Sequence, residues 1–270
     1  MRHLSDVRAL IKGGGEIGSG VAYRLSMSKV KVCITEMATS LAVTRGTTFS
    51  EAVFDRTKTV MGLTAELCSN GLSDVERLWQ IGRIPILVDP QAEAKHEIKP
   101  DVLVDAILAK RNTGTTMKDA PLVIGVGPGF CAGDDVHLVV ESNQGADLGK
   151  VITEGQAEKN TGIPVEIGGL TRERVVWASE AAIFKTDREI GDSVVMDQTV
   201  GWLGVNQIKA PIGGILRGLL RDGTSVPKGR KLVEVDPVND SSVCHIISQK
   251  ALTVGDGVLS AIKMKLSDGR

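Results

Sequence analysis

Short runs of β-branched and aliphatic residues recur along the chain and predict the strands of a sheet. Six runs stand out, at residues 7–11, 30–35, 84–88, 102–108, 122–126 and 136–141. Most are almost continuously apolar and lack the alternation of a strand with one face in water. Such runs are typical of strands buried on both faces of a parallel sheet. The pattern therefore predicts a sheet that other elements cover on both sides.

Helical spacing separates several of these strands. After the first strand, one helical face collects the apolar residues Ile17, Val21, Ala22 and Leu25. A second helix is expected to open at the sequence SDVE, residues 73–76, which has the spacing of a capping box, and to run through Leu78 and Ile81. The alternation of strands and helices predicts an α/β fold that is Rossmann-like, with a mostly parallel sheet.

The pattern changes near residue 172, where two segments repeat each other. The matched pairs, spaced by 32 residues, are Ile183 with Ile215, Gly191 with Gly223, Ser193 with Ser225, Val194 with Val226 and Leu203 with Val235. Two copies are too few for a solenoid, which needs at least three repeats to bury a continuous core. The repeat predicts an inserted all-β module with internal twofold pseudosymmetry at residues 172–237.

This module resembles the barrel-sandwich hybrid of biotinyl and lipoyl domains, down to the sequence IKAPIGG at residues 208–214. Those domains carry their modified lysine at the tip of a hairpin that precedes the Ala-Pro pair. Here only the sequence GVNQIK separates the preceding strand from Ala210, so the hairpin is expected to be missing. Lys209 lies directly beside Ala210, and we expect it to carry no prosthetic group.

The chain thus divides into three parts. Residues 1–171 are predicted to form a Rossmann-like ligand-binding domain, and residues 172–237 the β module without a modification hairpin. Helical spacing over residues 248–262 is interrupted by Gly255 and Gly257. We interpret residues 238–270 as a return to the α/β domain, which makes the β module an insertion.

Composition narrows the classes of function. The chain of 270 residues contains three Trp, one Tyr and four Phe, and its net charge is −1. Few aromatic rings for base stacking and no excess of positive charge argue against nucleic-acid binding. The four cysteines are far apart and suggest neither a disulfide framework nor a zinc motif. No apolar run has the length of a signal-peptide core or a membrane span, so we expect a cytoplasmic protein that crosses no membrane.

Ligands of open parallel sheets bind beyond the carboxyl ends of the strands, and the first strand ends in a glycine-rich turn. Gly13, Gly15 and Gly18 have the GxGxxG spacing between a strand and a helix. This spacing lets a phosphate approach the backbone at the helix N-terminus. Glu36, at the end of the second strand, has the position of a ribose-binding acid. The alternative is a tight turn beside an exposed glutamate.

The loop after the fourth strand brings positive charge to the same edge. It contains Lys110, Arg111 and Asn112, followed by small hydroxyl side chains. Two cations and several small donors suit an anionic ligand, since the guanidinium can make bidentate contacts with it. The alternative is a solvated turn with ordinary surface charges.

The loop after the fifth strand, GPGFCAG, is the second glycine-rich turn at this edge. Gly127, Gly129 and Gly133 free its backbone to bend, so that its N–H groups can form an anion-binding nest. Cys131 is either a nucleophile with a lowered pKa or a small space-filling residue. The DDVH sequence that follows is a weak metal pattern, with its histidine more often structural, and we expect no metal.

Together these stretches resemble the YqeB-type accessory proteins of selenium-dependent molybdenum hydroxylases. The resemblance rests on KGGGEIGSGVAYRL, TEMATSLAVTRGTTFSEAVF, IPILVDP, KPDVLVDAILAKRNTGT, APLVIGVGPGFCAGDDVHLVVESNQGADLG, NTGIPVEIGG, APIGGILRGLLRDG and ISQKALTVGDGVLSAI, in this order along nearly the whole chain. It implies a role in the maturation of xanthine-dehydrogenase-like enzymes that carry a molybdopterin cofactor and labile selenium. It implies no settled reaction and no catalytic residues. The family's glycine loop often has Thr in place of Cys131, which argues against an indispensable thiolate there.

The sequence therefore predicts an accessory factor that binds a phosphate-bearing ligand during cofactor maturation. A molybdopterin dinucleotide or a selenophosphate-like species fits this description, and another nucleotide stays open as the cofactor. The expected partners are a molybdenum hydroxylase or other maturation factors; the oligomeric state and any catalysis stay open. Two alternatives remain: an NAD(P)-dependent oxidoreductase, and a scaffold that docks a hydroxylase through the β module.

Overall fold

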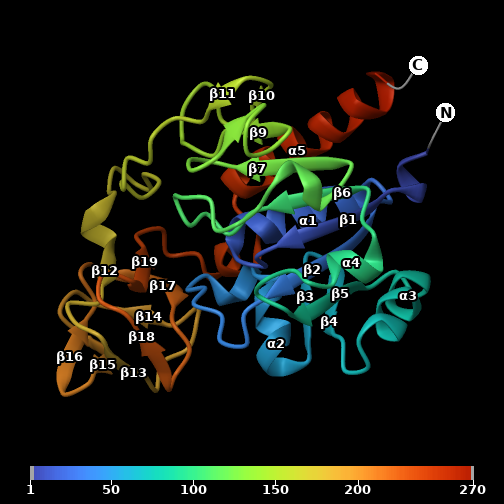
Figure 1. Cartoon of the computed structure of the whole chain (residues 1–270). Coiled ribbons are helices and arrows are strands. Elements are labelled where there is room, and N and C mark those ends of the chain that lie inside the picture. Colours follow the sequence, from blue (N-terminus) through green and yellow to red (C-terminus); the bar gives the residue numbers. More distant parts are fainter. Residues whose placement is uncertain (1–2, 269–270) are drawn as a thin grey trace. The chain divides into compact units, whose positions relative to one another are not determined.

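The computed structural model describes residues 3–268, which divide into two compact units (Figure 1). The first unit runs up to Ser40 and also contains Phe49–Thr161 and the chain from Ile247 onward. The second unit consists of Leu41–Thr48 and Gly162–Ile246. It extends beyond residues 172–237 on both sides and takes in a segment near residue 45 that the sequence pattern did not signal. Each unit has a hydrophobic core of its own.

The first unit is mixed α/β, built around a nine-stranded sheet in the order β10-β9-β7-β6-β1-β2-β5-β4-β3. The strands that pair in parallel are β1 (Arg8–Lys12), β2 (Lys31–Glu36), β4 (Leu63–Leu67), β5 (Ile84–Val88), β6 (Val102–Asp105), β7 (Leu122–Val126) and β9 (Leu138–Val140). The edge strands β3 (Thr57–Val60) and β10 (Val151–Ile152) are antiparallel. A mostly parallel sheet is therefore confirmed.

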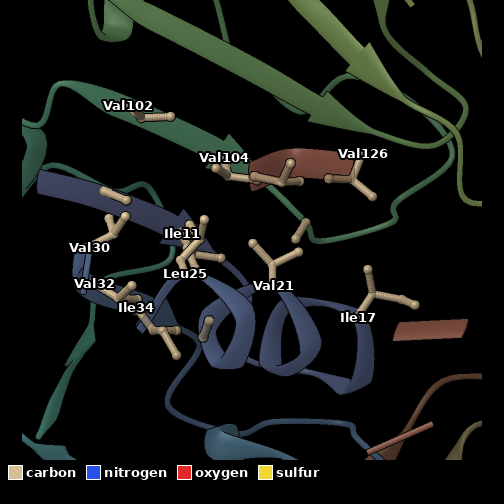
Figure 2. Packing of buried hydrophobic residues seen from close by; sticks show 14 of the residues in the cluster. Ile11, Ile17, Val21, Leu25, Val30, Val32, Ile34, Val102, Val104 and Val126 are labelled. Carbon is tan, nitrogen blue, oxygen red and sulfur yellow. The ribbon is translucent and has the colours of Figure 1, made fainter. Parts of the chain in front are cut away.

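Helices pack on both faces of this sheet. In β1, Ala9 and Ile11 belong to the core that includes α1 (Glu16–Met27) and α5 (Gln249–Asp268). Leu10 points to the opposite core, which includes residues of α3 (Leu72–Gln80) and α4 (Lys95–Ile98). Figure 2 shows apolar side chains of α1 facing the strands. Burial on both faces explains why the sequence of these strands is almost continuously apolar.

Shorter elements complete the first unit. They are the helix α2 (Ala52–Asp55), the small antiparallel pair β8 (Cys131–Ala132) and β11 (Gly155–Gln156), and the 3₁₀ turns η1 (Leu4–Asp6), η3 (Phe49–Glu51) and η4 (Met117–Asp119). Across the described residues, no helix is long and apolar enough to span a membrane.

The predicted capping box of α3 does not form. The helix begins at Leu72 with Gly71 as its N-cap, so Ser73 lies inside the first turn. The hydroxyl of Ser73 donates to the carbonyl of Asn70, and the carboxylate of Asp74 accepts the backbone N–H groups of Ser69 and Asn70, both at 2.8 Å. These backbone bonds come first among the causes that lower the pKa of Asp74. Asp74 thus fixes the loop before the helix.

The second unit contains two four-stranded antiparallel sheets, in the orders β12-β19-β17-β14 and β16-β15-β13-β18. Its strands are β12 (Val175–Trp177), β13 (Ala182–Lys185), β14 (Ser193–Val194), β15 (Thr199–Leu203), β16 (Asn206–Lys209), β17 (Gly214–Leu219), β18 (Thr224–Val226) and β19 (Lys231–Asp236). The 3₁₀ turns η2 (Arg45–Thr47), η5 (Arg172–Arg174) and η6 (Ser241–His245) accompany them.

The topology confirms the two-copy repeat. A shift of 32 residues carries β13, β14 and β15 onto β17, β18 and β19. Strand β14 of the first copy pairs with β17 of the second, and β18 of the second pairs with β13 of the first. The two copies therefore exchange their short strands, which is the arrangement expected of a unit with internal twofold pseudosymmetry.

A hairpin does precede Ala210, contrary to the expectation from sequence. Strands β15 and β16 pair antiparallel from Leu203 opposite Asn206 to Thr199 opposite Lys209. Gly204 and Val205 form the turn, and the Val205 side chain at its tip is 94% exposed. Lys209 lies at the other end of the hairpin, so the tip presents valine where a modified domain would present lysine.

Candidate ligand-binding site

The glycine-rich turn lies where the strand order of the large sheet reverses. From β1 the chain adds β2 and β5 on one side, then β6 and β7 on the other. Lys12 and Asp105, the last residues of β1 and β6, are partners in register. The carboxyl ends of these two strands therefore form a topological switch point, which is where open α/β sheets bind their ligands.

Glu36 holds the glycine-rich turn against the end of β2. Its buried carboxylate accepts the backbone N–H of Gly14 and that of Met37, both at 2.8 Å. Gly13 has a φ of +91°, which favours glycine, and a Cβ on Gly18 would collide with the carbonyl oxygen of Gly13. Glu36, Gly13 and Gly18 thus shape the turn itself, and Glu36 is not the exposed side chain of the alternative interpretation.

Gly15 differs from its neighbours in the turn. Its φ of −66° is open to any residue, and a Cβ built on it meets nothing within 4 Å. It is the N-cap of α1, and because glycine has no side chain, the helix has no side-chain cap there. Neither conformation nor packing requires glycine here. Its effect is to leave the backbone at the N-terminus of α1 open to an approaching group.

Acidic residues close to the ends of four strands serve the loops that follow. They are Glu36, Asp89, Asp105 and Glu141. Glu36 holds the glycine-rich turn. The carboxylate of Asp89 accepts the N–H groups of Glu93 and Ala94, and that of Asp105 accepts the N–H of Ile107. The carboxylate of Glu141 accepts the N–H groups of Ser142, Asn143 and Glu158. Buried backbone donors need such partners where a strand ends and its ladder stops. Polar residues gather at this edge partly for that reason.

A buried polar cluster lies beside the turn. The ammonium of Lys12 donates to the hydroxyl of Thr115 at 2.6 Å and pairs with the carboxylate of Asp105 at 3.2 Å. The Thr115 hydroxyl donates to the same carboxylate at 2.6 Å. All three residues are buried. Asn112 supports Thr115, because its amide oxygen accepts the Gly114 and Thr115 N–H groups and its nitrogen donates to the Thr115 carbonyl.

Two predicted site residues, Lys110 and Arg111, lie exposed on the loop after β6. This loop contacts the loop after β7 as predicted, because a Cβ on Gly129 would lie only 2.6 Å from the backbone nitrogen of Arg111. Gly127 similarly leaves room for the side chain of Ser142 in the loop after β9. Both glycines also have positive φ, at +110° and +75°. Their absent side chains bring three loops into contact at one edge of the sheet.

The predicted anion nest in GPGFCAG has several of its donors already occupied. The N–H of Gly127 donates to the Val140 carbonyl at 2.8 Å, and that of Gly133 to the Val136 carbonyl at 2.9 Å. The Cys131 N–H donates to the carboxylate of Asp135 at 2.9 Å. The group held at Cys131 is therefore a carboxylate of the chain itself. Gly133, with a φ of +87°, serves the turn.

The histidine that follows this loop bonds to the backbone of β7. The Nδ1 of His137 accepts the Val123 N–H at 3.0 Å, and burial, with the charge of Lys265, lowers the pKa of the imidazole. Cys131 is half-buried in β8. Burial raises the pKa of the Cys33, Cys68 and Cys244 thiols, that of Cys68 to about 12. Within the described residues, no group of three or more His, Cys, Asp or Glu side chains could hold a metal ion.

Sequence reasoning missed the Lys12, Asp105 and Thr115 cluster. A signal was present: in both strands that meet at the switch point, three apolar residues precede a charged last residue, Lys12 in β1 and Asp105 in β6, with opposite signs. Thr115 carries no such signal, because only the folding of the loop brings it back to the strand ends.

The sheet and its loops define the class: an α/β protein whose nucleotide-binding-like sheet carries a glycine-rich turn at the switch point. No protein-family model matches the chain. It is 42% identical over 260 residues to "Uncharacterized protein YqeB" of Escherichia coli (strain K12), an alignment that covers 96% of this chain. The chain is a YqeB-type protein. It spans about half, 48%, of the length of that relative.

Solved structures give only distant likenesses. The E. coli tRNA N6-threonylcarbamoyladenosine dehydratase TcdA, in complex with ATP, aligns over 53% of this chain and 60% of its own, with 16% identity and a TM-score of 0.28. A succinylglutamate desuccinylase/aspartoacylase from Rhodobacter sphaeroides aligns over 87% and 86%, with 15% identity and a TM-score of 0.27. At such TM-scores, neither likeness carries an argument about this chain.

Proposed function

We propose that this protein is an accessory factor in the maturation of selenium-dependent molybdenum hydroxylases. In this proposal, the first unit is Rossmann-like and binds a phosphate-bearing ligand, either a molybdopterin dinucleotide or a selenophosphate-like species. The second unit is a barrel-sandwich hybrid without a prosthetic group. The partner is a molybdenum hydroxylase or another maturation factor.

The observation that carries the ligand-binding part of the proposal is the open backbone at Gly15. Glu36 and the close contact between Gly13 and Gly18 hold the turn, while no atom lies within 4 Å of where a side chain on Gly15 would begin. The N–H groups at a helix N-terminus bind phosphate through hydrogen bonds and the helix dipole. The location at the switch point supports the same interpretation.

The exposed cations of the neighbouring loop supply the charge that such a ligand requires. Among residues 3–268, no hydrogen bond or ion pair engages the guanidinium of Arg111. An arginine can hold two oxygens of one phosphate at once. Because its loop leaves β6 beside β1, we expect the guanidinium and the helix N-terminus to share one ligand.

Native mass spectrometry of the purified protein is the first test. We expect a mass above that of the polypeptide, released on denaturation and identified as a dinucleotide or a selenium-containing species. A nicotinamide dinucleotide that turns over would instead support the oxidoreductase. A bare polypeptide that also fails to bind inorganic pyrophosphate or ADP would contradict ligand binding and leave the docking scaffold.

The variant Gly15→Val tests the location of the ligand. The valine side chain would cover the helix N-terminus, so we expect pyrophosphate binding at least tenfold weaker by calorimetric titration. The circular dichroism spectrum should stay native, because the position has room and an ordinary φ. Gly145→Ala, at another glycine where an added Cβ would meet no neighbour within 4 Å, is the matched control. Unchanged affinity in folded Gly15→Val would place the ligand elsewhere.

A further inference from the structure

The buried cluster of Lys12, Asp105 and Thr115 connects the ends of β1 and β6 to the loop that follows β6. We propose that Thr115, held by Lys12 and Asp105, is a positioning residue that fixes the backbone of Arg111 at the ligand edge. The ligand class that this arrangement selects is a compact oxyanion with at least two charged oxygens, such as a pyrophosphate group. This inference rests on the proposed function, because it assumes that Arg111 contacts the ligand.

The loop between Asp105 and Thr115 is anchored at both ends. At its start, the Asp105 carboxylate accepts the N–H of Ile107 at 3.2 Å. At its end, the Thr115 hydroxyl lies between the Lys12 ammonium and the other Asp105 oxygen, at 2.6 Å from each. One carboxylate thus binds both ends of the loop. Arg111 lies in the span between these anchors.

The conformation of that span is one that the chain does not adopt without support. Leu108 and Lys110 have φ values of +56° and +63°, in the left-handed region that favours glycine. Such residues persist only where the surrounding structure fixes them, and they cluster at functional sites. The contact of Gly129 with the Arg111 backbone is a third constraint, from a different strand. The anchor at Ile107, the anchor at Thr115 and the contact with Gly129 thus together constrain the backbone of Arg111.

A buried ion pair gives little net stability compared with apolar residues of similar size, because both charges lose their hydration. It does define a single geometry, since an ammonium, a hydroxyl and a carboxylate bond to one another in few arrangements. The Lys12 cluster is therefore better suited to fixing the loop than to stabilising the sheet. A fixed guanidinium loses less freedom when it binds a phosphate group in two places.

The test is a double-mutant cycle with inorganic pyrophosphate as the probe, measured by calorimetric titration. Thr115→Val removes the hydroxyl while keeping the shape, Thr115→Ser restores the hydroxyl, and Arg111→Ala removes the guanidinium. We expect Thr115→Val and Arg111→Ala each to weaken binding about tenfold, and Thr115→Ser to bind like the wild type. The variant with both changes should bind no more weakly than Arg111→Ala alone, because Thr115 acts through Arg111.

If Thr115→Val folds poorly, a second variant can loosen the loop between Asp105 and Thr115. Asn112→Ala removes two bonds that hold Thr115 but changes none of the three side chains of the buried cluster. It should also weaken pyrophosphate binding, and the double variant with Arg111→Ala should bind no more weakly than Arg111→Ala alone. Hydrogen exchange over residues 106–116 should rise in both variants.

The outcomes separate this inference from the proposed function. If the wild type binds pyrophosphate, Arg111→Ala weakens it and Thr115→Val does not, the positioning role is overturned while the proposed function stands. Effects of Thr115→Val and Arg111→Ala that multiply in the double variant also overturn it. If the wild type purifies without a ligand and binds neither pyrophosphate nor ADP, the proposed function fails and the positioning role fails with it.

Discussion

At the scale of single residues, buried carboxylates shape this protein more than their sequence context indicates. Glu36 ends β2 and Glu141 directly follows β9, where a ligand-binding acid is expected, yet their oxygens accept backbone N–H groups of nearby loops. The position of each acid is evident in the sequence but its partner is not, because the donors come from residues up to 22 positions away. A strand-end acid is therefore ambiguous until the path of the loop is known.

Glu234 is the carboxylate whose pH dependence can be predicted. Burial would raise its pKa, but the charges and hydrogen bonds of Lys231 and Arg174 outweigh burial and hold the pKa at about 2. The ordinary value is 4.5. Because the pKa of Glu234 is lower in the folded state than in the unfolded state, the ionised carboxylate stabilises the fold. This stabilisation is complete above the unfolded pKa and is lost as the pH falls from about 4.5 to 2. A shift of this size corresponds to roughly 3 kcal/mol.

We therefore expect Glu234→Gln to lower the free energy of unfolding of the second unit at pH 7 and to flatten its loss between pH 4.5 and 2. Urea denaturation followed by the fluorescence of Trp177 and Trp202, in a Trp79→Phe background, measures this unit. The exposed Glu166→Gln removes the same formal charge and is the control. If the free energy of unfolding fell equally between pH 4.5 and 2 in Glu234→Gln and in the parent, the ion pair of Glu234 would not be the cause of the loss.

The sequence predicted the location of the candidate site but not the role of each of its residues. The GxGxxG spacing located the glycine-rich turn, because a strand, a tight turn and a helix follow one another in the local sequence. That the turn lies at a switch point depends on the pairing of distant strands, which the local sequence does not show. The separate roles of its glycines were not predictable: Gly18 is required by packing, whereas Gly15 is not. The nest around Cys131 looked open in sequence because nothing there shows that Asp135 turns back to accept the Cys131 N–H.

At the scale of elements, local periodicity predicted the buried strands and missed the exposed ones. Strands β1, β2, β5 and β7 lie where the apolar runs placed them. The hairpin of β3 and β4 was missed, because its residues are largely part-exposed and carry polar side chains. The fourth run was expected to reach residue 108, but β6 ends at Asp105, where the carboxylate turns the chain.

The glycines of the last helix were also misjudged. The sequence suggested that Gly255 and Gly257 interrupt it, yet α5 is continuous over 20 residues. A Cβ on Gly255 would lie 2.7 Å from the carbonyl oxygen of Gly20 in α1, and a Cβ on Gly257 would collide with the carbonyl of Gly149. These glycines let α5 approach α1 and a neighbouring loop closely. Local sequence shows the helix-weakening residue but not the contact that compensates for it.

This contact predicts the sign of the Gly20→Ala substitution. In an open helix interior, alanine stabilises by up to about 1 kcal/mol over glycine. Here the new methyl group would collide with the backbone carbonyl of Ala251, which cannot rotate away as a side chain could. Overpacking costs roughly 1–3 kcal/mol, so we expect a net loss of stability in urea denaturation. Gly145→Ala, where the space is open, should show no such loss. A stabilised Gly20→Ala would mean that the helices can separate at little cost.

At the scale of the whole molecule, the chain passes between its two units four times, at residues 40/41, 48/49, 161/162 and 246/247. The repeat in the sequence marked the strands of the second unit but not the short segment Leu41–Thr48 that completes it. A segment this short has no periodicity of its own. Its membership follows from contacts with strands about 170 residues later, such as the bond from Arg45 Nε to the Leu219 carbonyl at 2.7 Å.

The last prediction concerns this segment. Val43 is 9% exposed within the core of the second unit, and its carbonyl accepts the N–H of Leu219 at 2.9 Å. Val43→Ala removes two methyl groups from that core, and we expect a loss of roughly 1–3 kcal/mol in the stability of the second unit. Hydrogen exchange read by mass spectrometry should show faster exchange in β17 and β19. Exchange in β1 and β2 should not change, because these strands belong to the first unit's own core.

Val195→Ala is the matched control, because it makes the same substitution at a valine that is 69% exposed in the wild type. It should leave exchange in both units as it is in the wild type. If Val43→Ala instead accelerated exchange equally in β1 and β17, the two units would unfold as one. In that case the short segment would couple the whole molecule, and the ligand edge of the first unit would depend on the integrity of the second. If only β17 and β19 respond, the segment belongs to the second unit alone. The ligand binding proposed for Gly15 should then survive Val43→Ala unchanged.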